Sequence, residues 1–333
     1  MMAWMLILTS CSRKYTDITH PIDMQEDLSD KVSIHHLCRK IELIPLESDG
    51  DRLGGLGKMA VSDKRFFFQD GARTIRSWGM DGKRLKTFAV SADISDFSLY
   101  EDRAIEVLSG FNVFEYDIES FSMQNKIRIP DTTAVLTSLM RWNGILHFVG
   151  YRGNRLFACE YYLDDDTYFP IGENLIVRAD LLQEVAAKSR YFRCGTDNYM
   201  FYAHSGSVIY VSRFRSPKFG WELSGDDGTP PAIFDNMQMT ASMLYGSFRW
   251  KGNRYLLMQE MWKERPTIIG QTKGGLCFPL GVIRDNVNYY CCPASELDKY
   301  VSRKVLDKEN ATRLDSLKNK PGFVILKYTL VGK

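Results

Sequence analysis

The chain has 333 residues, of which 44% are apolar and 25% are charged. These proportions are typical of a soluble globular protein with a substantial core, in one large domain or two ordinary ones. The 43 basic and 41 acidic residues leave a net charge of +2, and this balance excludes the strongly basic character of nucleic-acid-binding domains. Aromatic residues make up 13% of the chain and are mostly Tyr and Phe, which favour β structure.

The N-terminus predicts export. Residues 1–10 form a short apolar run that ends in small residues, as a secretory signal peptide does, and the run is too short to span a bilayer. The order Leu8-Thr9-Ser10-Cys11 resembles the lipobox of bacterial lipoproteins, which implies lipid attachment at Cys11 and membrane anchoring. The alternative is an apolar segment that packs on the domain. Residues 11–40 are polar and irregular, and we predict a tether there.

Paired apolar runs recur after residue 58, each pair joined by a turn that contains Gly, Asn or Asp. The phrase RWNG at 141–144 returns as RWKG at 249–252. Six such turns predict six hairpins, at Asp63-Lys64, Glu101-Asp102, Asn143-Gly144, Asp197-Asn198, Lys251-Gly252 and Asp285-Asn286. A hairpin every ~40–50 residues is the signature of a β-propeller with four strands per blade.

The two ends of this pattern predict how the ring closes. A strand without a partner at 41–47 precedes the first hairpin, and the strand at 322–330 has no fourth strand after it. Pairing these two strands covers both exposed edges and closes the ring. We therefore predict an all-β fold, a six-bladed β-propeller that forms one domain over 41–333. A pair of unrelated β domains is the alternative.

At this point the chain resembles a known family. Cys11 after a lipobox, IELIPLES at 41–48, the irregular blades, KGGLCFPLGVIRDN at 273–286 and GFVILKYTL at 322–330 occur in the order found in six-bladed β-propeller lipoproteins of Bacteroides and its relatives. The resemblance implies the fold and a location in the cell envelope, and it carries no reaction and no site residues. Surface lipoproteins of the Bacteroidetes often carry acidic residues after the Cys. Here Arg13 and Lys14 follow, which favours the periplasmic side.

Three insertions interrupt the regular spacing, at about 171–190, 222–242 and 293–320. The first and third have short helical patterns, and the second has the composition of a loop. Strand order predicts that all three emerge on one face, around the mouth of the central channel. Loops on a rigid scaffold often carry binding residues, although these segments could instead only plug the channel. The candidate binding residues on this face are Arg152, His204, Trp221, Trp262 and Lys263.

No motif of known chemistry is present in the sequence. The chain has no P-loop and no G-x-S-x-G elbow, and we predict no cofactor. His35, His36 and Cys38 lie in the predicted tether without a second cluster, so we predict no metal site. Beyond Cys11, six cysteines remain with no C-x-x-C, and they fit small buried residues, with one disulfide possible in an oxidising envelope.

Three classes of function therefore stay open. The leading interpretation is a binding module that captures a glycan, a peptide or a partner protein. The alternative is a hydrolase or lyase acting on a saccharide or peptide at the channel mouth, which a cluster of carboxylates or His there would favour. The third is a structural subunit of an envelope complex, which a large exposed apolar patch would indicate.

Overall fold

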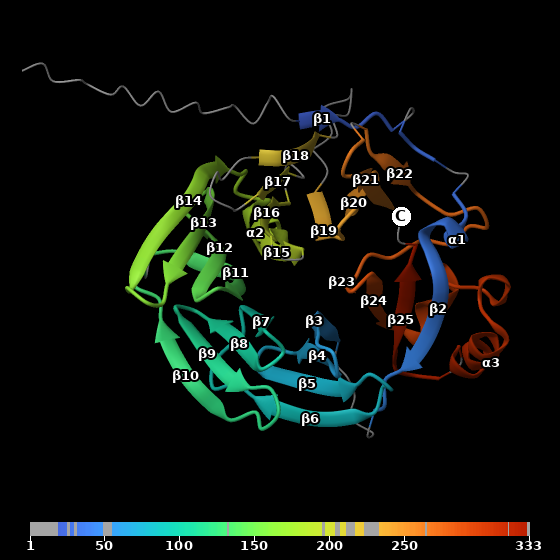
Figure 1. Cartoon of the computed structure of the whole chain (residues 1–333), viewed down its shortest axis with the longest axis horizontal. Helices are drawn as coiled ribbons and strands as arrows, with labels where there is room; N and C mark the ends of the chain where they lie inside the picture. The colour runs from blue at the N-terminus through green and yellow to red at the C-terminus, as the bar shows by residue number, and fades with distance from the viewer. Residues whose placement is uncertain are drawn as a thin grey trace, which may run out of the picture.

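The structure is a computed structural model. It describes residues 19–24, 27–29, 32–48, 55–131, 133–194, 197–203, 207–210, 217–222, 233–263, 265–318 and 320–331. These residues form six sheets arranged as a ring, in which the strands are antiparallel apart from one added parallel strand. The first of the four blade strands in each sheet lies toward the centre (Figure 1). The ring of radial sheets is that of a β-propeller, and the predicted propeller class is confirmed.

The sheets follow one another in chain order. Sheet 1 contains β3 (Leu56–Val61), β4 (Arg65–Asp70), β5 (Thr74–Gly79) and β6 (Arg84–Ala89). Sheet 2 contains β7 (Asp96–Tyr100), β8 (Ala104–Ser109), β9 (Asn112–Asp117) and β10 (Met123–Arg128). Sheet 3 contains β11 (Val135–Trp142), β12 (Ile145–Arg152), β13 (Arg155–Tyr162) and β14 (Thr167–Ile176).

The second half of the ring is less regular. Sheet 4 contains β15 (Arg190–Cys194), β16 (Asp197–Tyr202), β17 (Ser207–Tyr210) and β18 (Pro217–Glu222), and β1 (Thr19–Pro21) adds to it as a fifth strand. Sheet 5 contains β19 (Ile233–Met239), β20 (Met243–Trp250), β21 (Asn253–Glu260) and β22 (Thr267–Ile269). Sheet 6 contains β23 (Val282–Arg284), β24 (Val287–Pro293), β25 (Phe323–Leu330) and β2 (Cys38–Pro45). Five sheets are thus regular four-stranded blades, so the predicted count of six blades needs correction at sheet 4, which has a fifth strand.

The N- and C-terminal strands close the ring as predicted. β2 pairs antiparallel with β25, with Ile44 opposite Ile325, and so supplies the outer strand of sheet 6. The predicted bounds of 41–47 shift to Cys38–Pro45. Apolar side chains fill the wedges between neighbouring sheets, and Leu43, Phe67, Phe148 and Leu326 are fully buried there. The core therefore runs around the ring between the sheets.

The segment predicted as a tether follows the outside of the ring instead. β1 pairs in parallel with β18 of sheet 4, and Leu28 bridges Ile268 of sheet 5. Helix α1 (Ile34–Leu37) then leads directly into β2. We call the described residues of this segment, 19–24, 27–29 and 32–37, the N-terminal strap. It differs from a tether because it pairs with the outer strands of sheets 4 and 5, whose edges have backbone N–H and C=O groups without a partner inside their own sheet.

One predicted hairpin occupies a different place in its blade. The turn at Lys251-Gly252 joins β20 and β21, the second and third strands of sheet 5, whereas the turn at Asn143-Gly144 joins the first and second strands of sheet 3. The first strand of sheet 5 is β19, which lies in the predicted insertion 222–242. Positive φ values at Lys251 (46°) and Gly252 (79°) suit any tight hairpin, so the turn pattern cannot distinguish the two positions.

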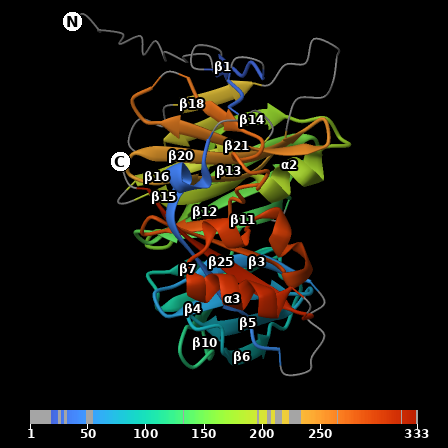
Figure 2. The same cartoon turned by 90° about the vertical axis from the view of Figure 1, so that its right-hand side faces the viewer.

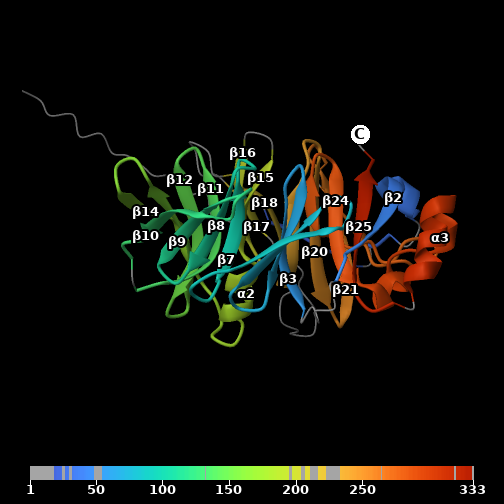
Figure 3. The same cartoon turned by 90° about the horizontal axis from the view of Figure 1, so that it is seen from below.

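The insertions do not gather at one place. Helix α2 (Leu182–Lys188), in the first insertion, packs against the strands β11, β12 and β19. The third insertion forms the 3-10 helices η2 (Ala294–Lys299) and η3 (Arg303–Val305) and helix α3 (Lys308–Leu317). Helix α3 lies outside the ring against β2 (Figure 1) and faces the viewer in Figure 2, which corrects the prediction that this insertion surrounds the channel. We call the end of the ring where α2 lies the α2 face, and the opposite end the hairpin face (Figure 3).

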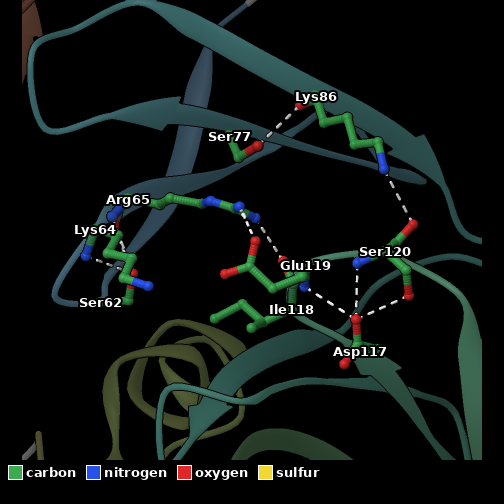
Figure 4. A network of polar contacts seen from close by, with 9 residues as sticks. All are labelled: Ser62, Lys64, Arg65, Ser77, Lys86, Asp117, Ile118, Glu119 and Ser120. Carbon is green, nitrogen blue, oxygen red and sulfur yellow. Dashed lines mark hydrogen bonds and ion pairs between the residues drawn. The ribbon is translucent and has the colours of Figure 1, made fainter.

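Neighbouring sheets are also joined by polar contacts. Between sheets 1 and 2, the Arg65 guanidinium donates to the carbonyl of Ile118 at 2.6 Å, and the Lys86 amine donates to the carbonyl of Ser120 at 3.1 Å (Figure 4). The Asp117 carboxylate accepts from the Ser120 amide at 2.7 Å and fixes this turn. These bonds set the position of one sheet against the next.

Helix α3 caps the outer edge of β2, and this contact gives a first prediction. The Asn310 side chain is buried, and its oxygen accepts from the backbone N–H of Leu43 at 2.9 Å. We expect Asn310→Ala to lower the free energy of unfolding by about 1–3 kcal/mol, because a buried N–H loses its partner. Chemical denaturation measures this loss. Thr312→Ala on the exposed side of the same helix is the control, and an equal loss there would contradict the prediction.

Candidate functional site

The first strands of all six sheets begin at the α2 face and surround a chamber there. Its volume is about 530 Å³, within the range of small-molecule sites. Each of the first strands, or the residues just before it, contributes to the wall, through Leu56, Lys58, Asp96, Val135, Leu136, Arg190, Asn236, Gly281 and Val282 among others. The chamber is thus a product of ring closure.

Lys58 is the first charged group of the chamber. The register of β3 shifts between Leu56 and Met59, so Lys58 lies at an irregularity of the strand. Its amine lies 2.5 Å from one oxygen of Asp96, whose other oxygen accepts from the backbone N–H of Leu139 at 2.8 Å. Burial lowers the pKa of Lys58, and the Asp96 carboxylate opposes this effect in part. The pair joins sheets 1, 2 and 3 at the chamber wall.

Arg190 is the second charged group and begins β15 directly after α2. Its guanidinium makes two long hydrogen bonds, both to backbone carbonyls: 3.3 Å to Asp235 and 3.4 Å to Lys188. It forms no ion pair with a carboxylate in the described part of the chain. Burial lowers the pKa of Arg190, while the negative charges of Asp96 and Asp235 raise it.

The chamber therefore holds a surplus of positive charge, with two cations and one carboxylate. Three of its other polar side chains are occupied by the protein itself. The Asn236 amide donates to the carbonyl of Gly281 at 2.7 Å, and the Gln69 amide donates to that of Ile94 at 3.3 Å. The Thr137 hydroxyl donates to the carbonyl of Ala186 at 2.9 Å. Lys58 and Arg190 are the charged groups of the described lining that can donate to a ligand.

The hairpin face has a second cavity, of about 610 Å³, with a different character. Arg284 lies in its wall and bonds Asp102 at 2.8 Å, Asp63 at 2.6 Å and the carbonyl of Val61 at 2.9 Å. These contacts tie sheet 6 to sheets 1 and 2. Because its guanidinium is already paired, Arg284 serves the ring rather than a ligand.

The binding residues predicted from the sequence do not lie together in the structure. Arg152 lies on the α2 face but pairs with Asp131 at 2.5 Å. Trp221 is 1% exposed and belongs to the core, so it is not part of a binding face. Trp262 is 63% exposed and, with Lys263, follows β21 on the hairpin face, because sheet 5 starts one strand earlier than predicted. His204 and Cys11 lie outside the described residues.

Sequence reasoning missed Lys58, Asp96 and Arg190. Lys58 lies in GLGKMA at 55–60, which fails as a dinucleotide-binding loop, and Arg190 ends the first predicted insertion. Nothing local to either residue shows that it faces the other. The available signal was a charged residue at the start of a first strand, where all six strands converge.

The described cysteines are not cross-linked. No disulfide joins any two of them. Burial raises the pKa of Cys291 in the chamber wall, which keeps its thiol protonated. Cys292 points to the opposite side of the strand and is buried in the core, as predicted for neighbours in a strand. Within the described ranges, no group of three metal-binding side chains occurs and no helix is long and apolar enough to cross a membrane.

Comparison with known proteins supports the fold and identifies no family. No family model matches the chain, and no curated protein matches it. The crystal structure of a presumed exported protein from Bacteroides fragilis superposes with a TM-score of 0.70 at 11% identity, over 95% of this chain and 99% of that one. This likeness supports the propeller fold alone.

Two further structures are much less similar. The computationally designed protein Ika8 has a TM-score of 0.40 at 11% identity, over 68% of this chain and 63% of its own. The N-terminal domain of Nup159 has a TM-score of 0.48 at 10% identity, over 80% and 76%. Neither likeness carries an argument about this protein.

Proposed function

We propose that this chain is a cell-envelope lipoprotein whose propeller binds a glycan or a peptide in the chamber on the α2 face. The observation that supports the proposal most is the chamber itself, of about 530 Å³, with two cations in its wall. The ring that surrounds it is a six-bladed propeller in which the five-stranded sheet 4 serves as the irregular blade.

The charged groups favour binding over hydrolysis. Glycosidases commonly use a pair of carboxylates, one as acid and one as base or nucleophile. Among the described residues of the chamber wall the carboxylate is Asp96, and it is engaged by Lys58 and by the Leu139 amide. Of the large apolar side chains that are exposed, Leu85, Met123 and Phe169 lie on the outer strands of three different sheets, which gives little support to a structural subunit.

A substitution at the chamber entrance tests the binding function. Val135 lines the chamber and is 49% exposed, so Val135→Trp fills space without disturbing the core. We expect glycans or peptides captured by the wild-type protein on an array to be lost by Val135→Trp. Met123→Trp, at an exposed position of β10 away from the chamber, is the matched control. Binding that survives Val135→Trp would place the ligand elsewhere.

The location in the envelope rests on the lipobox and on the name of the Bacteroides fragilis neighbour. We expect the full chain made in a Bacteroides host to incorporate a labelled fatty acid at Cys11 and to face the periplasm. Cys11→Ser should abolish the label, and protease added to intact cells should leave the protein whole. A label that persists in Cys11→Ser would refute the anchor, and cleavage on intact cells would refute the periplasmic side.

A further inference from the structure

We propose that the chamber selects ligands that carry a carboxylate, which Arg190 and Lys58 bind together. This inference rests on the proposed function, because it names the chemical class of ligand that the same chamber takes. It applies equally to an acidic sugar and to the C-terminus of a peptide, since both present the same group.

Arg190 supplies the main argument. A buried guanidinium normally pairs with a carboxylate, because its five N–H donors fit the two oxygens of that group. Here the hydrogen bonds of its guanidinium, at 3.3 and 3.4 Å, are long and go to backbone carbonyls. The protein thus holds this partly buried cation without giving it the carboxylate that its geometry suits.

Charge balance supplies the second argument. Asp96 neutralises one of the two cations, and its second oxygen is held by the Leu139 amide, so it has little capacity left for Arg190. Asp235 also attracts Arg190, but its carboxylate pairs with Lys188 at 2.7 Å. The described chamber wall therefore keeps one more positive than negative charge, and a ligand with one negative charge balances it. Charge-assisted hydrogen bonds of this kind are about twice as strong as neutral ones.

The rest of the chamber suits a ligand in which the carboxylate is attached to a small, partly apolar group. The lining includes the apolar side chains of Leu56, Leu136, Leu280 and Val282. A volume of about 530 Å³ is of the size that holds a small ligand. Arg193, on the same strand β15, lines the cavity at the hairpin face instead, and so offers a matched control cation.

The test is calorimetry on the full chain carrying Cys11→Ser, with paired probes. Glucuronate is compared with glucose, and the dipeptide Ala-Ala with its C-terminal amide. We expect at least one acid to bind and its neutral counterpart not to bind. Arg190→Gln should weaken that binding by about 10- to 100-fold, the value of one lost charge-assisted bond. Arg193→Gln should leave the affinity for the acid unchanged. Arg190→Lys keeps the charge but lacks the planar guanidinium, so its affinity should lie between those of the wild type and Arg190→Gln.

The outcomes separate the two proposals. Binding of glucuronate alone assigns an acidic sugar, and binding of Ala-Ala alone assigns a peptide. Equal binding of acid and neutral probes, unchanged by Arg190→Gln but lost in Val135→Trp, overturns the carboxylate inference and leaves the chamber function standing. Failure of both acids to bind at millimolar concentration also overturns the inference. Array ligands that still bind Val135→Trp overturn the proposed function. Thermal melting of each variant confirms that it is folded.

Discussion

Replacing Gly281 by alanine is expected to lower the free energy of unfolding by more than about 3 kcal/mol. A Cβ at this position would lie 1.8 Å from the carbonyl oxygen of Tyr289 and 2.9 Å from the Cα of Tyr290. Both obstacles are backbone of β24, which cannot move without breaking sheet 6. Overpacking usually costs about 1–3 kcal/mol, and a clash with backbone exceeds that range.

Gly281 is also fixed on both sides by hydrogen bonds. Its N–H donates to the buried Asn288 side chain at 2.9 Å, and its carbonyl accepts from Asn236 at 2.7 Å. The substitution should therefore open the chamber wall as well as destabilise the ring. Gly153→Ala is the control, because nothing lies within 4 Å of its Cβ position and only its left-handed backbone resists, at about 1–2 kcal/mol. Equal losses in urea denaturation would refute the argument.

Replacing Arg141 by methionine is expected to cost about 3–5 kcal/mol at pH 8.5, because it leaves a buried carboxylate without its partner. Glu106 is completely buried between sheets 2 and 3, and the Arg141 guanidinium lies 3.2 Å from it and 3.0 Å from Glu115. Burial raises the pKa of Glu106 to about 7, and Arg141 opposes this effect. Without Arg141 the pKa of Glu106 should rise further.

The pH dependence of this loss follows from the raised pKa. A carboxyl whose pKa is higher in the folded state contributes stability below its ordinary value of 4.5, and this contribution is lost as the pH rises through about 7. The wild-type protein should therefore lose part of its stability between pH 5 and pH 8. Arg141→Met should lose more, so the difference between the two proteins should be larger at pH 8.5 than at pH 5.5.

The control for this experiment is Arg103→Met, because Arg103 contacts the same aromatic ring as Arg141. Arg103 and Arg141 both lie over Tyr100, with centroid distances of 5.1 and 4.3 Å, but the side chain of Arg103 is 66% exposed. Arg103→Met should change the free energy of unfolding by less than about 1 kcal/mol at either pH, as for surface ion pairs. A loss for Arg141→Met that does not vary with pH would show that Glu106 is not the group responsible.

Arg284 and Arg190 show how similar residues acquire different roles in this ring. Both lie in the wall of a cavity at one end of the central channel. Arg284 meets the carboxylates of Asp63 and Asp102 and joins sheet 6 to the first two sheets. Arg190 meets backbone carbonyls and remains available. The proposed ligand site is therefore on the α2 face.

The sequence by itself determined the β-propeller class and the closure of the ring. Its turns are local: Asn143-Gly144 and Asp285-Asn286 adopt positive φ, which these residue types tolerate better than others, and each forces a hairpin. The pairing of β2 with β25 follows because β2 has no other partner and β25, which pairs with β24 on one side, would otherwise leave its second edge open. The alternation of apolar residues supplied the rest of this prediction.

Only the tertiary structure decided which strand each turn joins and which side chains meet. The turn at Lys251-Gly252 looks the same between any two strands of a blade, so Trp262 and Lys263 were assigned to the opposite face. Trp221 is buried in a core cluster that also contains residues of sheets 3 and 5, and those residues come from other parts of the chain. Lys58, Asp96 and Arg190 meet because ring closure brings the starts of six first strands together, and no local pattern encodes that convergence.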